Sequence, residues 1–123
     1  MNNVLSSDAF AELLGYVLTT RFTYWAELGL TYATPSMEIE IGEKFARVTY
    51  CELYKDAAEP SHHSAVAFIA LCEFENKGLG KVRAGDVFKS ASYKAPAKHA
   101  RGNIYDESGV DCWGWHGPHY LRG

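Results

Sequence analysis

The spacing of apolar residues changes once along the chain, and this change constrains the fold more than any other feature. Between residues 8 and 28, apolar side chains recur three and four positions apart, which places them on one face of a helix. They are Phe10, Leu13, Leu14, Val17, Leu18, Phe22, Trp25 and Leu28. Ser7 or Asp8 is suited to cap the helix start, and Gly29 is suited to end it. We therefore predict an amphipathic helix over residues 8–28.

After Pro35 the apolar spacing falls to two, which is typical of half-buried strands. The predicted strands are MEIEI (37–41), FARVTYCELY (45–54), AVAFIALCEF (65–74) and the shorter DVFKSA (86–91), with a loop over residues 56–63. The third is apolar on both faces, as a central strand would be. These elements predict an α+β fold in which the N-terminal amphipathic helix packs on a three- to four-stranded antiparallel sheet, as a single domain over residues 1–123.

The composition indicates a folded protein in a reducing compartment. Hydrophobic residues make up 47% and charged residues 22% of the 123 residues, which is unlike a disordered chain. No apolar run approaches the roughly 18 residues that cross a bilayer, and the N-terminus lacks the pattern of a secretion signal. The odd number of cysteines favours reduced thiols, with Cys51 and Cys72 acting as small core residues. We expect a cytoplasmic protein without membrane contact.

Positive charge is concentrated in one part of an otherwise acidic chain. The formal net charge is -3, yet residues 78–105 hold six Lys or Arg against the single acid Asp86. We call residues 85–103, GDVFKSASYKAPAKHARGN, the basic segment. Within it, Pro96 suits the first position of a short helix and Gly102 suits its end, so a short basic helix is predicted.

Such a segment has two interpretations. As a polyanion-binding site, its cations would contact phosphate oxygens while Tyr93 or Phe88 stacks on a base. The predicted contact residues are Lys89, Tyr93, Lys94, Lys98, Arg101 and Asn103. The alternative is a solvated charged face that keeps the chain soluble. The sequence leaves open whether these cations pair internally with Glu38, Glu40 and Glu43.

The run from residue 85 to 106, GDVFKSASYKAPAKHARGNIYD, resembles a motif of small uncharacterised proteins of tailed bacteriophages and environmental viral sequences. In that motif, G-D is followed by an apolar residue, Lys, small residues, Ser, an aromatic residue and Lys, and then by P-A-K, Arg and Asn. The matching residues are Gly85, Asp86, Lys89, Ser92, Tyr93, Lys94, Pro96, Ala97, Lys98, Arg101 and Asn103. The tail HGPHYLRG is similar to the G-P-x-Y-L ends of such proteins.

The chain departs from this pattern in two places. Tyr93 stands where the motif has tryptophan, and the connection NKGLGKVRA before Asp86 is longer. The resemblance implies a phage-type origin and action inside an infected bacterial cell. It implies no particular activity.

A metal site is a weaker interpretation of the C-terminal tail. Cys112, His116 and His119 in CWGWHGPH offer three ligands, and His62 or His63 is a candidate fourth ligand for zinc. The tail lacks a paired C-x2-C and contains Gly114, Gly117 and Pro118, which favours ordinary histidines over a rigid ligand platform. We therefore assign no metal and no cofactor.

The tail is also rich in aromatic residues, which again has two interpretations. These rings either pack against the body of the protein or form an interface for a host protein, together with the acidic strands. The interface candidates are Trp113, Trp115 and Tyr120. The chain has no G-x-S-x-G sequence and no phosphate-binding glycine loop.

We expect a non-enzymatic binding module for nucleic acid or another polyanion. A host-protein-binding module is the main alternative, and a metal-dependent enzyme is the third. The oligomeric state stays open.

Overall fold

The computed structural model describes residues 3–92, 94–108, 112–114 and 117–118, and it begins with the predicted helix. Helix α1 runs over Asp8–Glu27, within one residue of the expected bounds. The Ser7 hydroxyl caps it by accepting a hydrogen bond from the Phe10 N–H at 3.1 Å. Gly29 has a φ of +69°, a left-handed conformation that stops the helix at little steric cost.

The buried face of α1 is narrower than the sequence predicts. Phe10, Leu13, Val17 and Trp25 are buried, whereas Phe22 is 45% exposed. Phe22 follows Leu13 by about two and a half helical turns, which turns it away from the sheet. Leu28 lies beyond the last helical residue and is also exposed.

The main sheet has five antiparallel strands in the order β1-β2-β3-β6-β7. They are β1 (Ala33–Ile41), β2 (Phe45–Tyr54), β3 (Ser61–Ala70), β6 (Asp86–Lys89) and β7 (Gly102–Asn103). The prediction of an α+β fold with a helix on an antiparallel sheet is confirmed, but the strand number of three to four was too low. The strand β7 was not predicted because its two residues are too few to show an alternating pattern. The expected central strand, β3, is indeed the middle strand of the sheet.

Four strand boundaries differ from the sequence expectations. β3 ends at Ala70, four residues before the predicted end, and β6 ends at Lys89, two residues before it. The other two differences are strand starts. β1 begins at Ala33, four residues before the MEIEI pattern, and includes Pro35 on the edge strand. Proline is tolerated there because an edge strand has N–H groups that need no ladder partner. β3 begins at Ser61, so part of the predicted loop over residues 56–63 belongs to a strand.

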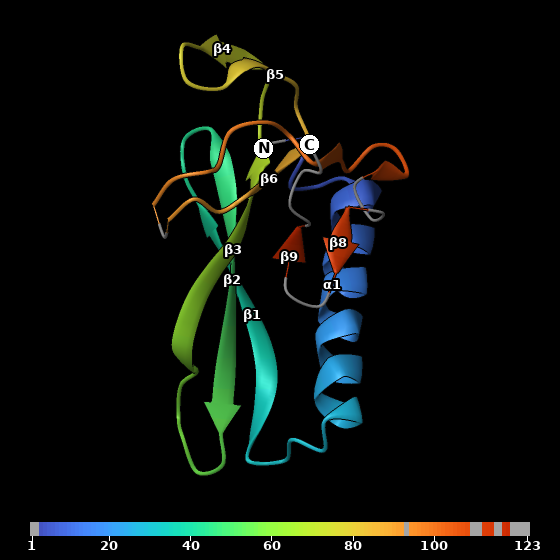
Figure 1. Cartoon of the computed structure of the whole chain (residues 1–123), viewed down its shortest axis with the longest axis vertical. Coiled ribbons are helices and arrows are strands. Elements are labelled where there is room, and N and C mark those ends of the chain that lie inside the picture. Colours follow the sequence, from blue (N-terminus) through green and yellow to red (C-terminus); the bar gives the residue numbers. More distant parts are fainter. Residues whose placement is uncertain (1–2, 93, 109–111, 115–116, 119–123) are drawn as a thin grey trace.

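Two short ribbons complete the described architecture. β4 (Phe74–Asn76) pairs with β5 (Gly80–Val82) between β3 and β6, and Figure 1 shows this ribbon projecting beyond the end of the main sheet. β8 (Trp113–Gly114) pairs with β9 (Gly117–Pro118). β9 contacts β3 and β6, and β8 contacts α1. The tail ribbon therefore joins the helix to the sheet.

The two faces of the sheet bury different apolar clusters. Ala46, Val48 and Tyr50 of β2 face α1, where they pack with Leu13 and Val17. On the opposite face, Phe45 packs edge-to-face against Phe68, Phe74 and Phe88. This alternation along β2 follows from the two-residue period of a strand. It also directs every second residue of β2, including Cys51, away from the helix.

The predicted short basic helix between Pro96 and Gly102 is wrong. Pro96 instead forms an isolated bridge with Ser90, and the N–H of Ala97 bonds to the Lys89 carbonyl at 2.7 Å. His99 has a φ of +69°, which a helix does not allow. Because the Ala97 N–H donates to a carbonyl of β6, it is not available for a helical hydrogen bond.

No helix in the described part of the chain combines the length and the hydropathy that a membrane crossing requires.

Candidate polyanion-binding segment

The basic segment leaves the sheet at the end of β6 and returns to it in β7. Between these strands its backbone is tied to β6 at two points, since Ala97 N–H donates to Lys89 O and Arg101 N–H donates to Val87 O, each at 2.7 Å. Within the loop, the N–H groups of Ala91 and Ser92 both donate to the Ala95 carbonyl. The segment is thus a loop without helix whose ends are fixed by the sheet.

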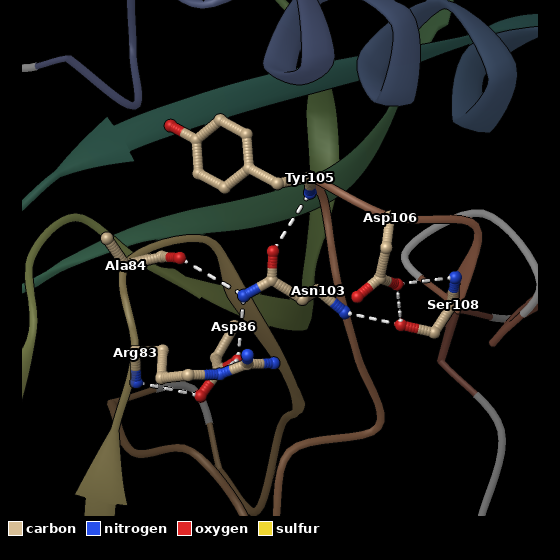
Figure 2. A network of polar contacts seen from close by, with 7 residues as sticks. All are labelled: Arg83, Ala84, Asp86, Asn103, Tyr105, Asp106 and Ser108. Atoms are coloured by element: carbon tan, nitrogen blue, oxygen red, sulfur yellow. Dashed lines mark hydrogen bonds and ion pairs between the residues drawn. The ribbon is translucent and has the colours of Figure 1, made fainter.

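A buried polar network holds the base of this loop (Figure 2). The Asn103 amide donates to Asp86 Oδ1 at 2.9 Å and to the Ala84 carbonyl at 3.1 Å, and its oxygen accepts from the Tyr105 N–H at 2.9 Å. Asp86 Oδ2 accepts from the Arg83 N–H at 2.9 Å. Asp86 and Asn103 are 6% and 5% exposed. Asn103, one of the predicted polyanion contacts, therefore uses its side chain inside the fold, and we leave it out of the proposed contact set.

Gly85 is fixed by its backbone and by its neighbours. Its φ of +88° lies in the left-handed region, and a Cβ built there would stand 2.8 Å from the ring of Tyr105. Only glycine fits this corner without a shift. Gly85, Asp86 and Asn103 of the motif that resembles phage proteins thus have a structural explanation in the β6–β7 corner.

Lys89 and Arg101 are half-buried cations that sit near one another. The Lys89 ammonium donates to the Pro118 carbonyl at 3.0 Å. Burial lowers the pKa of Lys89, and the nearby Arg101 charge lowers it further. The Arg101 guanidinium donates to the Lys98 carbonyl at 2.7 Å and to the His99 carbonyl. Arg101 therefore holds the turn at residues 98–101, besides contributing charge.

Lys94 and Lys98 are the outward-facing cations of the segment. Both are exposed, and neither forms an ion pair with an acidic residue in the described ranges. Lys94 lines a shallow depression of about 300 Å³. The other charged residues that line it are the cations Lys44 and Arg47 and the acids Glu40 and Glu43. Tyr93, proposed to stack on a base, lies outside the described residues. Phe88, its alternative, is only 2% exposed and cannot stack.

Two of the three acids named as partners for these cations pair with other residues instead. Glu38 pairs with His63 at 3.2 Å, and Glu40 pairs with Arg47. The first pair joins β1 to β3, and the second joins β1 to β2. The sequence question about Glu38 and Glu40 is thus answered by partners within the sheet.

The aromatic tail is partly a core element. Trp113 is 3% exposed, and its indole N–H donates to the Tyr50 hydroxyl at 2.9 Å. In this arrangement its ring packs between α1 and the sheet, so it offers no surface to a partner. Trp115 and Tyr120, the other two interface candidates, lie outside the described residues.

Of the three weak metal-ligand candidates of the tail, only Cys112 lies within the described residues. Cys112 is half-buried and its N–H donates to the Ser108 carbonyl, whereas His116 and His119 lie outside the described residues. A different set converges instead: Glu38, Cys51 and His63 lie on three neighbouring strands. Sequence reasoning missed this set because its members are 12 or more positions apart and meet only through the strand register.

Comparison with known protein families finds a match over most of the chain. The model of a family of unknown function, DUF7717, matches residues 11–118, which include nearly all of α1 and every described strand. Curated proteins and solved structures give no match.

Proposed function

The chain belongs to DUF7717, and we propose that it is a non-enzymatic accessory protein of phage type whose basic segment binds nucleic acid. The observation that carries the proposal is the exposure of Lys94 and Lys98 without an acidic partner among the described residues. The phage-type part of the proposal rests on the resemblance of residues 85–106 to proteins of tailed phages.

The shape of the segment supports a contact with an extended anion. The loop is anchored at its base by the Asp86–Asn103 network and along its return by Arg101 N–H to Val87 O. A backbone held in this way presents the lysines at a smaller entropic cost than a free chain would. Phosphate contacts of exposed lysines require no deep cleft.

The charge arrangement supports the same function. Burial is the main cause that lowers the pKa of Lys89, and repulsion by the nearby Arg101 charge adds to it. A phosphate placed beside them would relieve this repulsion, because an anion favours the protonated form of the lysine. Lys94 and Lys98 would add positive charge at exposed positions of the same segment. The proposed contact set is therefore Lys89, Lys94, Lys98 and Arg101.

The test is fluorescence anisotropy of labelled single-stranded DNA, duplex DNA and RNA at several salt concentrations. We compare the wild type with the Lys94→Ala/Lys98→Ala double variant, whose two side chains are exposed and form no ion pair with the described residues. Loss of two phosphate contacts should lower the slope of log K against log salt by about 1.8 for duplex DNA and about 1.4 for single strands. Arg101 is left intact because it also holds the turn.

The matched control is the Lys55→Ala/Lys77→Ala variant, which removes the same charge from exposed positions outside the segment. It should bind as the wild type does. If the control loses as much affinity as the test variant, binding depends on overall charge and the assignment to the basic segment fails. If the folded wild type binds no nucleic acid at low salt, the proposal itself fails.

A protein partner is the second candidate, and exposed apolar side chains outside the basic segment favour it. Large apolar side chains are exposed on α1, β1, β2 and the α1–β1 connection, as single positions: Tyr16, Phe22, Leu28, Tyr32, Ile41 and Leu53. Such side chains can anchor an interface. Affinity purification from host lysate with the wild type and with Phe22→Ser/Ile41→Ser tests this candidate. A partner kept equally by both proteins would exclude this surface.

A further inference from the structure

A side-chain cluster outside the basic segment lies on the face of the sheet that points away from α1. Glu38 comes from β1, Cys51 from β2 and His63 from β3, so each of three adjacent strands contributes one residue. The carboxylate oxygen, thiol sulfur and imidazole nitrogen all lie within 4.8 Å of one another. These are three different kinds of metal-binding atom gathered at one point.

The strand register explains how residues so far apart in sequence meet. Ser36 is the partner of Cys51 and Thr49 is the partner of Glu38, so Glu38 and Cys51 are diagonal neighbours on one face. Between β2 and β3 the register shifts: Tyr50 pairs with Ser64, but Glu52 pairs with Ser61.

Between these two pairs β3 contains one residue more than β2, which is a β-bulge. Bulges re-aim a side chain and occur often beside functional sites. Here the bulge places the His63 imidazole toward the face of Cys51, and its Nε2 lies 3.2 Å from Glu38 Oε2. The irregularity of the strand thus has a direct consequence for the cluster.

Burial within the cluster is graded from floor to mouth. Cys51 is 1% exposed, whereas the side chains of His63 and Glu38 are 36% and 41% exposed. A cation would therefore enter past the histidine and the carboxylate and meet the sulfur beneath them. Burial raises the pKa of the Cys51 thiol, and the Glu38 charge adds to the effect, against a hydrogen bond with Ser36. A bound cation would reverse this balance by stabilising the thiolate.

A buried polar atom beside the cluster has no hydrogen-bond partner among the described residues. Thr49, directly opposite Glu38 on β2, is fully buried, and its Oγ1 has no hydrogen bond to any described residue. A buried hydroxyl without a partner is costly, and such groups occur where water or an ion completes the structure. This hydroxyl and the three converging ligands are independent observations of the same place.

We propose that Glu38, Cys51 and His63 form a binding site for a borderline divalent cation, with Zn²⁺ as the best fit. Zinc accepts thiolate, imidazole and carboxylate ligands, and three protein ligands leave a fourth position for water. Tetrahedral bonds to such ligands separate the donor atoms by about 3.5 Å. The distance between His63 Nε2 and Glu38 Oε2 is already close to this value. Small rotations of these two partly exposed side chains would bring both ligand atoms to a similar distance from the Cys51 sulfur. The site is independent of the basic segment.

The test uses Co²⁺ as a spectroscopic substitute for zinc in the full-length protein. Binding through Cys51 produces a thiolate-to-cobalt charge-transfer band and the visible bands of a tetrahedral ion, with one Co²⁺ per chain. Zn²⁺ should abolish these bands by competition. His63→Gln and Glu38→Gln should weaken Co²⁺ binding by no less than the roughly 10- to 100-fold that loss of an outer-shell partner costs.

Matched variants identify the sulfur. Cys51→Ser should lose the charge-transfer band, whereas Cys72→Ser makes the same change at an exposed thiol and should keep it. If Cys112→Ser removes the band and Cys51→Ser keeps it, the metal belongs to the tail and the proposal fails.

Should Cys51→Ser fail to fold, His63→Gln decides, because its side chain is substantially exposed. Co²⁺ affinity unchanged by His63→Gln, or the absence of any cobalt–thiolate band in the folded wild type, overturns the proposal.

Discussion

Asn103 donates its side-chain amide to the Asp86 carboxylate across the β6–β7 pair, with 2.9 Å between Nδ2 and Oδ1, and both side chains are buried. The same two residues are the paired partners of the strand register. The network therefore links the two strands from which the basic segment departs and to which it returns. Its polar atoms are satisfied by the protein itself, which is the condition for burying them at tolerable cost.

Asn103→Asp tests this relationship by replacing a donor with a second carboxylate. The variant should lose roughly 3 kcal/mol of unfolding free energy near neutral pH, because two buried carboxylates repel and the Ala84 carbonyl loses its donor. Protonation of one carboxyl removes the repulsion and restores a donor. The deficit relative to wild type should therefore shrink as the pH falls. Urea denaturation of both proteins across the acidic range measures it.

The control for this variant is Asn3→Asp, which adds the same charge at an exposed position. It should leave stability within about 0.5 kcal/mol of wild type at every pH. A deficit in Asn103→Asp that is equally large at acidic and neutral pH would show that charge repulsion with Asp86 is not its cause.

Gly85→Ala tests the corner that precedes β6. The added Cβ would meet the Tyr105 ring at 2.8 Å and would force alanine to adopt a φ of +88°. We expect a loss of roughly 2–3 kcal/mol of unfolding free energy, measured by thermal or urea denaturation. The Gly85→Ala/Tyr105→Ala double variant removes the contact with the Tyr105 ring but keeps the backbone strain and the 3.0 Å approach to Ile104 Cγ1, so it isolates the contribution of the ring. If the single variant is as stable as the wild type, the corner is not constrained as described.

The periodic parts of the fold were predictable from sequence because they depend on local pattern. The bounds of α1 follow from its cap and its glycine, and the alternation of Met37 and Ile39 with the glutamates gives the correct faces of β1. The central place of β3 follows from its two apolar faces. The predicted helix near Pro96 failed for the opposite reason: backbone bonds from that loop to β6 outweigh local propensity.

The candidate sites were predictable only in part. The concentration of positive charge is visible in the sequence, but the partners of each cation depend on which strands lie beside it. Asn103 has the chemistry of a phosphate contact, yet its position opposite Asp86 directs it inward. The cluster of Glu38, Cys51 and His63 requires both the β1–β2 register and the bulge in β3. No short-range pattern encodes either feature.

Tyr50→Phe tests how the tail is held against the sheet. Tyr50 accepts the indole hydrogen bond of Trp113, and the Arg21 guanidinium lies 4.4 Å from the centre of its ring. Removing the hydroxyl leaves the buried Trp113 N–H without this acceptor, which should cost about 1–2 kcal/mol near neutral pH. Urea denaturation monitored by tryptophan fluorescence measures this loss. Tyr16→Phe is the matched control, since Tyr16 is 40% exposed.

The stability difference between the wild type and Tyr50→Phe should depend on pH. Burial raises the pKa of Tyr50, against smaller lowering effects of the Trp113 hydrogen bond and the Arg21 charge. A raised folded-state pKa gives stability that is fully present below the unfolded value of about 10 and is lost as the pH rises through the folded value. The wild type should therefore lose stability in this alkaline range and approach Tyr50→Phe. A stability difference that stays constant up to alkaline unfolding would contradict this assignment.

Thiol labelling should distinguish the cysteines. Cys51 is 1% exposed, and burial raises the pKa of its thiol, so both access and thiolate content are low. Cys72 is exposed and serves as the internal reference. If Cys51 reacts only after a local opening that costs about 3 kcal/mol, its labelling is slowed roughly 100-fold by that opening alone.

Iodoacetamide labelling followed by peptide mass spectrometry measures both rates in one sample. In urea the two rates should converge, because unfolding exposes both thiols. Equal rates in the native protein would show that the sheet face over Cys51 is open to reagents and that its burial is not maintained in solution.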